Sequence, residues 1–274
     1  MFASITLSRR IEAAEARLSA SLGRAGISGE QAEAFVHHIA GGVAVYTGPA
    51  SPMNKMIGAG FDGAAPDEDL RAVEDKFRER DAPLQAEVAT LADPAFVAQL
   101  TRRGYILQNF ENVLGRAIVS ADAEAGGQIL VEPMREHEAV AWMDAAYTGF
   151  AHPDGIGVPG DELPPREAFE AAMSPFMTVE GFRRYVARIG QDLAGVASFR
   201  IDDGVAQLCG AATLPAFRRR GVQAALLRRR LADGFNAGCD LAVITTQPGS
   251  TSQQNGHRQG FALLYTRAVL VKQP

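Results

Sequence analysis

The sequence predicts a mixed α/β protein built of two domains. Its 274 residues favour two domains of ordinary size over one. Helical and strand-like hydrophobic patterns alternate along the chain, as in a sheet covered by helices. A small, polar, glycine-ended segment at 120–127 separates two such successions. We therefore expect one domain at 1–124 and a second at 128–274.

Hydrophobic periodicity assigns the elements of the first half. Apolar residues at helical spacing predict a helix over 5–23. Ser28 and Gln31 have the spacing of a capping box, so we expect a second helix from Ser28 to the Gly41-Gly42 pair, with His37 and His38 as structural or surface residues. The remaining pattern predicts strands at 43–47, 56–61, 84–91 and 105–119, and helices at 67–80 and 94–104.

The second half is assigned in the same way. We expect strands at 129–134, 182–190, 193–201, 205–214, 240–246 and 261–272, and helices at 136–150, 166–173, 222–235 and 250–258. Residues 151–165 form a long loop in this assignment. Long loops inside compact domains are often binding elements. We interpret this loop as a wall of an acceptor site.

A basic turn between a strand and a helix is the main candidate binding site. The stretch Leu208–Gln223 runs from small apolar residues through Pro215 to Gly221 and a helix-forming segment. The first N–H groups of a helix lack partners inside the helix and carry partial positive charge, so they bind anions such as phosphate. Gly221 allows close approach of the backbone, and three guanidinium groups lie beside it: Arg218, Arg219 and Arg220.

Two motifs resemble the GNAT acetyltransferases. The string Arg218-Arg219-Arg220-Gly221-Val222-Gln223 resembles the family's [QR]-x-x-G-x-[GA] pyrophosphate loop, with Gln223 in place of the usual small residue. The string SQQNGHRQGFALLYTR near the end resembles the family's S-x-x-N-x-x-x-x-G-F-x-x-x-Y-T-R ending. The element order from residue 128 onward is similar to the complete GNAT fold. The resemblance implies a GNAT acetyltransferase domain at 128–274 that binds acetyl-CoA.

The resemblance also implies which residues form the site. Backbone groups around Ala212, Thr213 and Leu214 are expected to pair with the pantetheine arm and polarise the thioester carbonyl. The phosphate loop is expected to contribute Arg218, Arg219, Arg220, Gly221, Val222, Gln223 and Ala224. Ser252 and Asn255 either bind the cofactor's arm or cap and solvate their helix. No metal is expected.

Tyr265 is the candidate general acid. A phenol with a pKa near 10 is protonated at neutral pH and can donate to the departing thiolate. The general base is not assigned, because the strand that often carries a carboxylate in the family offers Gln207 and Cys209 here. Other residues considered for the base are Asp202, Asp203, His152 and Glu180.

The first half repeats part of the pattern of the second. When Gly104 is aligned with Gly260, apolar positions coincide along the following strands, while Asn109 stands opposite Tyr265. The segment FDGAAP at 61–66 replaces the arginine-glycine loop. We therefore expect residues 1–124 to be a degenerate GNAT-like copy that serves as a scaffold and binds no cofactor.

Charge and composition limit the function further. The formal net charge is -5, yet six arginines lie between Arg218 and Arg230, which suits one small polyanion and not a nucleic acid. No apolar run is long enough for a membrane span, and Cys209 and Cys239 are expected to be core thiols in a reducing compartment. We expect a cytoplasmic monomer or homodimer.

The sequence thus predicts an N-acetyltransferase that moves the acetyl group of acetyl-CoA directly to a primary amine of a small molecule. Two alternatives remain open at this point. One is a non-catalytic module that binds or senses acyl-CoA, which the missing strand carboxylate favours. The other is a protein N-acetyltransferase, which would need an open peptide groove.

Overall fold

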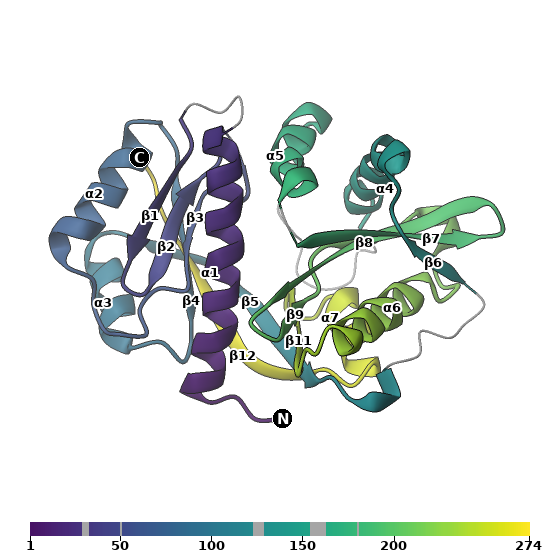
Figure 1. Ribbon diagram of the computed structural model, residues 1–274. Helices are drawn as coiled ribbons and strands as arrows, with labels where there is room; N and C mark the ends of the chain where they lie inside the picture. Colours follow the sequence, from purple (N-terminus) through teal and green to yellow (C-terminus); the bar gives the residue numbers. More distant parts are fainter. Residues whose placement is uncertain (29–32, 50, 123–128, 154–162, 180) are drawn as a thin grey trace. The chain divides into compact units, whose positions relative to one another are not determined.

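The computed structural model describes residues 1–28, 33–49, 51–122, 129–153, 163–179 and 181–274. The chain divides into two compact units (Figure 1). The first unit comprises Phe2–Asn112, Glu167–Val179 and Leu264–Pro274, and the second comprises Val113–Arg166 and Glu180–Leu263 together with Met1. These units do not coincide with the ranges 1–124 and 128–274, because one helix and the last strand of the second half belong to the first unit. The predicted domain limits stay a prediction.

The first unit is an α/β layer structure. In chain order it contains α1 (Ile5–Ser28), β1 (Phe35–Ile39), β2 (Gly42–Tyr46), β3 (Lys55–Ile57), α2 (Asp67–Arg78), β4 (Leu84–Ala89), α3 (Pro94–Arg102), the first part of β5 (Ile106–Ala117), most of α5 (Arg166–Thr178) and most of β12 (Ala262–Lys272). Its strand order is β1-β2-β3-β4-β12-β5. β3 and β4 are parallel, whereas β12 runs antiparallel to β4.

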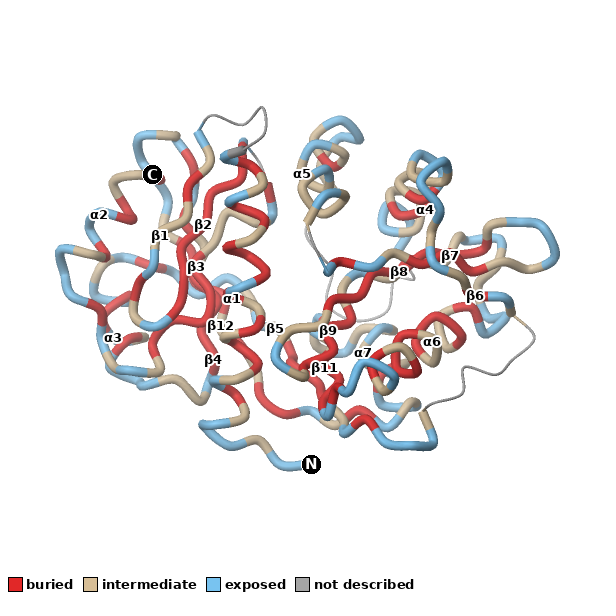
Figure 2. The backbone as a smooth tube through the Cα atoms, in the orientation of Figure 1, coloured by how far each residue is buried: buried red, intermediate tan, exposed pale blue. Residues whose placement is uncertain are grey.

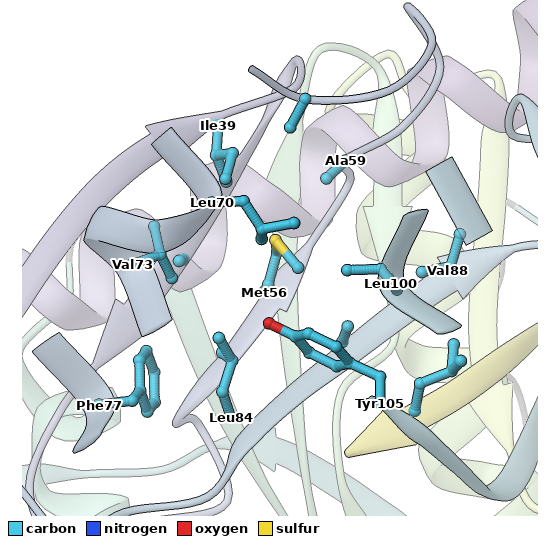
Figure 3. Packing of buried hydrophobic residues seen from close by; sticks show 14 of the residues in the cluster. Ile39, Met56, Ala59, Leu70, Val73, Phe77, Leu84, Val88, Leu100 and Tyr105 are labelled. Carbon is cyan, nitrogen blue, oxygen red and sulfur yellow. The ribbon is translucent and has the colours of Figure 1, made fainter. Parts of the chain in front are cut away.

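Alternation along β2 sorts its side chains between two faces. Val43 and Val45 pack with residues of α1, while Ala44 and Tyr46 belong to the larger core formed with α2 and α3. Figure 3 shows the packing of this core, and Figure 2 shows that the central strands are buried along their length. Successive side chains of a strand point to opposite faces of the sheet, so the two sets of residues on β2 are buried on opposite faces.

The helix predicted from Ser28 to the Gly41-Gly42 pair is wrong over its described part. Residues Phe35–Ile39 form β1, which pairs with β2 in a hairpin that joins Ile39 to Gly42. The two linking residues, Ala40 and Gly41, both have positive φ, at 47° and 82°. A two-residue turn with positive φ at both positions matches the twist of paired strands. The glycine pair therefore marks a hairpin and not a helix end.

The second unit carries the remaining strands of the sheet. Its elements are the last part of β5, β6 (Leu130–Pro133), α4 (Ala139–Ala151), β7 (Phe182–Ile189), β8 (Asp192–Asp202), β9 (Val205–Gln207), β10 (Ala211–Thr213), α6 (Val222–Asn236), β11 (Leu241–Thr246), α7 (Thr251–Arg258) and the start of β12. The strand order is β5-β11-β9-β8-β7-β6, with β10 paired to β8. α4 and α6 cover opposite faces of β7 and β8 (Figure 1).

The two halves share the succession strand, helix, strand, helix, strand. Each has a parallel strand pair, β3 with β4 and β9 with β11, around the first helix. The aligned glycines end α3 and α7 in the same way: Gly104 has φ 87° and Gly260 has φ 81°. The following residue closes each helix with a bond at 3.1 Å, from Tyr105 N to Leu100 O and from Phe261 N to Gly256 O. The fold is thus mixed α/β, and the two halves repeat the same succession of strands and helices.

A buried cluster of charged side chains connects β12 to other elements of the first unit. Arg267 is 1% exposed and its Nε donates to Glu12 Oε1 of α1 at 2.7 Å. Its Nη1 lies 3.5 Å from Glu87 of β4 and 3.6 Å from Glu111 of β5. Burial and the neighbouring Glu87 raise the pKa of Glu111 to about 7. The last strand is therefore held by side chains from three elements as well as by its backbone.

Among the helices of the described residues, none has the length and apolarity that a membrane span needs.

Candidate active site

A cleft of about 770 Å³ lies within the second unit. Its walls come from the end of α4, from β10 and the turn after it, from the start of α6 and from α7. The charged side chains among the described residues that line it are all basic: Arg218, Arg219 and Arg258. An anionic ligand of the size of a nucleotide cofactor matches this charge.

The start of α6 presents the anion-binding backbone that the sequence predicts. Gly221 is the N-cap and adopts a left-handed conformation, φ 86° and ψ 7°, without a side-chain cap. The first intrahelical bond to this residue runs from Ala225 N to Gly221 O at 3.0 Å. The N–H groups of Val222, Gln223 and Ala224 therefore come before the first hydrogen bond inside α6. All three residues line the cleft. This geometry suits a phosphate.

β10 forms a second wall and offers a strand edge. It pairs with β8 through Ala212 and Val196, and no other strand of the described residues pairs with it. Its other edge can therefore accept an extended ligand by backbone hydrogen bonds. Two hydroxyls of lining residues, Thr213 Oγ1 and Thr251 Oγ1, are buried and have no hydrogen-bond partner among the described residues. Such groups require a ligand or water.

The structure brings most of the predicted cofactor-binding residues together. The lining includes Ala212, Thr213, Arg218, Arg219, Gly221, Val222, Gln223, Ala224, Ser252 and Asn255. Leu214 and Arg220 are not part of it, and the Arg220 guanidinium lies 5.6 Å from the centre of the Phe217 ring. Arg218 Nη2 donates to the carbonyl oxygens of Gly149 and His152. This arginine thus ties the end of α4 to the phosphate turn.

The sequence interpretation missed several lining residues. They are Gly149, Pro153, Ala211, Pro215, Phe217, Thr251, Gln254 and Arg258. The α7 residues could have been found, because Thr251, Asn255 and Arg258 recur at helical spacing with Ser252. Gly149 could not, because its role is steric: a Cβ there would lie 2.5 Å from Ala212 Cβ. The absence of a side chain lets α4 approach β10.

Tyr265, the predicted general acid, lies in the first unit and does not line the cleft. The residue is 5% exposed, and its hydroxyl donates to Glu12 Oε1 at 2.7 Å. Burial and the Glu12 carboxylate raise the pKa of Tyr265 further above its usual value. The proton of this phenol is thus engaged by a buried acceptor of the same unit.

Of the residues considered for the general base, the described ones are not part of the cleft lining. Gln207 Oε1 accepts from Arg200 Nη1 at 3.0 Å, and Asp202 lies 3.7 Å from Arg200 Nη2. Asp203 adopts a turn conformation with φ 48°. His152 Nδ1 lies 2.9 Å from Thr148 O, and Glu180 is outside the described residues. None of these contacts places a base at the cleft.

The equivalent turn of the first unit, at the start of α2, carries acidic side chains where the second unit has basic ones. α2 begins after Pro66, and its first turn carries Asp67, Glu68 and Asp69. Three carboxylates occupy the helix end where a phosphate would bind, so they repel an anion there. This difference supports the prediction that the first half binds no cofactor.

The comparisons with known proteins agree with this geometry. Residues 139–261 match the model of the Acetyltransferase (GNAT) family, so this part of the chain is a GNAT domain. The match spans α4 to the end of α7 and contains the whole cleft. A comparison with curated proteins gives no match.

Solved structures with the same fold cover both halves. A GCN5-related N-acetyltransferase from Kribbella flavida is 17% identical, covers 94% of this chain and 95% of its own, and has a TM-score of 0.65. A tandem GNAT protein from the clavulanic acid biosynthesis pathway is 13% identical, covers 75% of this chain and 69% of its own, and has a TM-score of 0.56. A GCN5-related N-acetyltransferase from Sphaerobacter thermophilus is 13% identical with a TM-score of 0.55, covering 75% and 67%. The fold is that of the GNAT acetyltransferases.

Proposed function

We propose that the second unit binds acetyl-CoA in its cleft and transfers the acetyl group directly to a primary amine of a small molecule. The observation that carries the proposal is that three features meet in one cleft of the described residues: the helix start at Gly221, the strand edge of β10 that no described strand covers, and charged lining residues that are all basic. The helix start would hold the pyrophosphate, and the edge of β10 would pair with the amides of the pantetheine arm. Cys209 and Cys239 form no disulfide bond, which suits a reducing compartment.

The proposed reaction needs few side chains. A neutral amine attacks the thioester carbonyl, the carbon–sulfur bond breaks, and the departing thiolate takes up a proton. Backbone N–H groups near β10 would stabilise the oxyanion that forms on the carbonyl oxygen. Because Asp202 lies beside Arg200 and Asp203 adopts a turn conformation, we propose that water carries the proton from the ammonium.

The second candidate is a non-catalytic module that binds or senses acyl-CoA. It is favoured by one observation, the bond between the Tyr265 hydroxyl and Glu12, which occupies the proton that a general acid would supply. Both candidates need the cleft to bind the cofactor, so binding alone does not distinguish them. A measurement of acetyl transfer to an amine does distinguish them.

A screen of small primary amines with acetyl-CoA and a thiol-detecting reagent tests the proposal. We expect at least one amine to release CoA at a rate well above the hydrolysis of acetyl-CoA without amine. Binding of acetyl-CoA without release of thiol for any amine would support the sensing module instead. Absence of both binding and release would contradict both candidates.

Replacing Tyr265 with phenylalanine separates a structural from a catalytic role. The variant leaves a buried carboxylate of Glu12 without one of its donors, so we expect the free energy of unfolding to fall by about 1–3 kcal/mol. The general-acid role stays a prediction: an acid would in addition lose about 10²–10⁴-fold in kcat, with little change in KM for acetyl-CoA. Denaturant unfolding and steady-state kinetics measure the two effects. An unchanged kcat would remove Tyr265 from the mechanism.

A further inference from the structure

A buried arginine on α6 contacts the strand break behind the cleft. Arg230 is 2% exposed, and its guanidinium donates to main-chain oxygens only among its described contacts. Nε donates to Leu226 O at 3.1 Å, while Nη1 donates to Ser198 O at 3.1 Å and to Cys209 O at 3.2 Å. Burial lowers the pKa of Arg230 to about 10, so it remains charged at neutral pH. A buried charge is costly, so its contacts need an explanation.

The contacted carbonyls lie at a bulge between two strands. Ala197 pairs with Ala211 and Arg200 pairs with Gln207, so the two residues Ser198 and Phe199 face the three residues Leu208–Gly210. One extra residue on one strand is the definition of a β-bulge. Ser198 N is shared between Cys209 O at 3.4 Å and Gly210 O at 3.0 Å. The bulge separates β9, which pairs with β8 and β11, from β10, which among the described strands pairs with β8 alone and lines the cleft.

The contact to Cys209 O fixes the direction of a neighbouring N–H group. In a trans peptide the C=O and the following N–H point in opposite directions, and the structure has no cis peptide bonds. The Cys209 carbonyl points to Arg230 on α6, so the Gly210 N–H points away from α6. Gly210 N–H donates no hydrogen bond to the described residues. It precedes Ala211, the first lining residue of β10.

We propose that Arg230 is a positioning residue for acyl transfer: by holding the carbonyls of Ser198 and Cys209 it aims the Gly210 N–H at the thioester carbonyl oxygen. The inference rests on the proposed function, because it needs acetyl-CoA in the cleft. The planar guanidinium reaches both carbonyls and its own helix at once. Arg230 also joins the helix that starts at the phosphate turn to the strand break. Arg230 therefore connects the helix that would bind the pyrophosphate with the strand segment that would bind the thioester.

The test compares Arg230→Met and Arg230→Lys in the full chain. The Gly221 turn stays intact in both, so we expect CoA affinity to change by less than about threefold. Loss of one oxyanion donor typically costs about 10²–10³-fold in kcat, and a misdirected donor should cost about 10–100-fold in Arg230→Met. Arg230→Lys keeps the charge and one nitrogen that can donate, so part of the rate should return. Arg229→Met is the matched control, because Arg229 is the next residue of α6 and contacts Asp233 and Val131 O instead.

A spectroscopic readout makes the test independent of the acceptor amine. A hydrogen bond to the thioester carbonyl lowers its stretching frequency, which isotope-edited infrared spectra of acetyl-CoA labelled at the acetyl carbonyl detect. We expect bound acetyl-CoA to show a lowered frequency in the wild type and in Arg229→Met, and a frequency close to that of free acetyl-CoA in Arg230→Met. Equal frequencies in wild type and Arg230→Met, at retained CoA affinity, would overturn the inference while leaving the proposed function intact. No binding of acetyl-CoA by the wild type would overturn the proposed function and the inference with it.

Discussion

Replacing Arg267 with methionine is expected to lower the free energy of unfolding by about 3–5 kcal/mol, because removal of one partner from a buried ion pair leaves the other charge uncompensated. The arginine contacts Glu12 and Glu87, both of which are buried. Lys55, whose Nζ lies 2.8 Å from Glu87 Oε1, compensates only the latter. Glu12 can take up a proton once the arginine is gone, so the loss should be smaller at about pH 5 than at about pH 8.

Denaturant unfolding of the variant measures this loss. Lys272→Met is the matched control on the same strand, because Lys272 makes a partly exposed ion pair with Glu74 and should cost less than about 1 kcal/mol. The double variant Arg267→Met with Glu12→Gln removes both charges and should recover part of the stability. A loss below about 1 kcal/mol for Arg267→Met would contradict the view that this cluster fastens the last strand.

Replacing Gly221 with aspartate is expected to weaken CoA binding at least about 100-fold, because a carboxylate would face the pyrophosphate at the start of α6. The fold should tolerate the change. A Cβ on Gly221 would meet only Ile129 Cδ1, at an ordinary contact distance of 3.8 Å. Position 221 is left-handed, with φ 86°, and aspartate tolerates this conformation better than most residues.

Gly221→Asn is the control that separates charge from bulk. Asparagine has nearly the shape of aspartate and the same tolerance of positive φ, without the negative charge. We expect its CoA affinity to lie well above that of the aspartate variant and its thermal stability to be similar. Equal losses in the two variants would show that steric contact, and not charge, determines binding at this turn.

The sequence predicts the second half better than the first for a physical reason. The phosphate turn, α6 and α7 are local features, in which a glycine, a proline and helical spacing determine the backbone over a few residues. The hairpin of β1 and β2 was missed because the same glycines that end helices also form two-residue turns. The break between β9 and β10 was missed because it depends on the register with β8.

The surroundings of Tyr265 could not be predicted from its own motif. Its partner Glu12 is more than two hundred residues away in sequence, and the two meet because β12 lies between β4 and β5, two strands from the first half of the chain. Nothing in the spacing of G-F-x-x-x-Y-T-R indicates which unit receives the strand. The arginine of that motif, Arg267, is likewise the centre of the buried cluster in the first unit. Long-range strand pairing determines this part of the structure.

Calorimetric titration of the full chain with acetyl-CoA is the most direct test of binding at the Gly221 turn. We expect one molecule to bind per chain, because among the described residues the start of α6 lies in a cleft whose charged lining residues are all basic, while the first unit places Asp67, Glu68 and Asp69 at the equivalent turn. In Gly221→Asp the same titration should show no binding at micromolar ligand. Absence of binding to the wild type, or a site that persists unchanged in Gly221→Asp, would contradict binding of the cofactor at this turn.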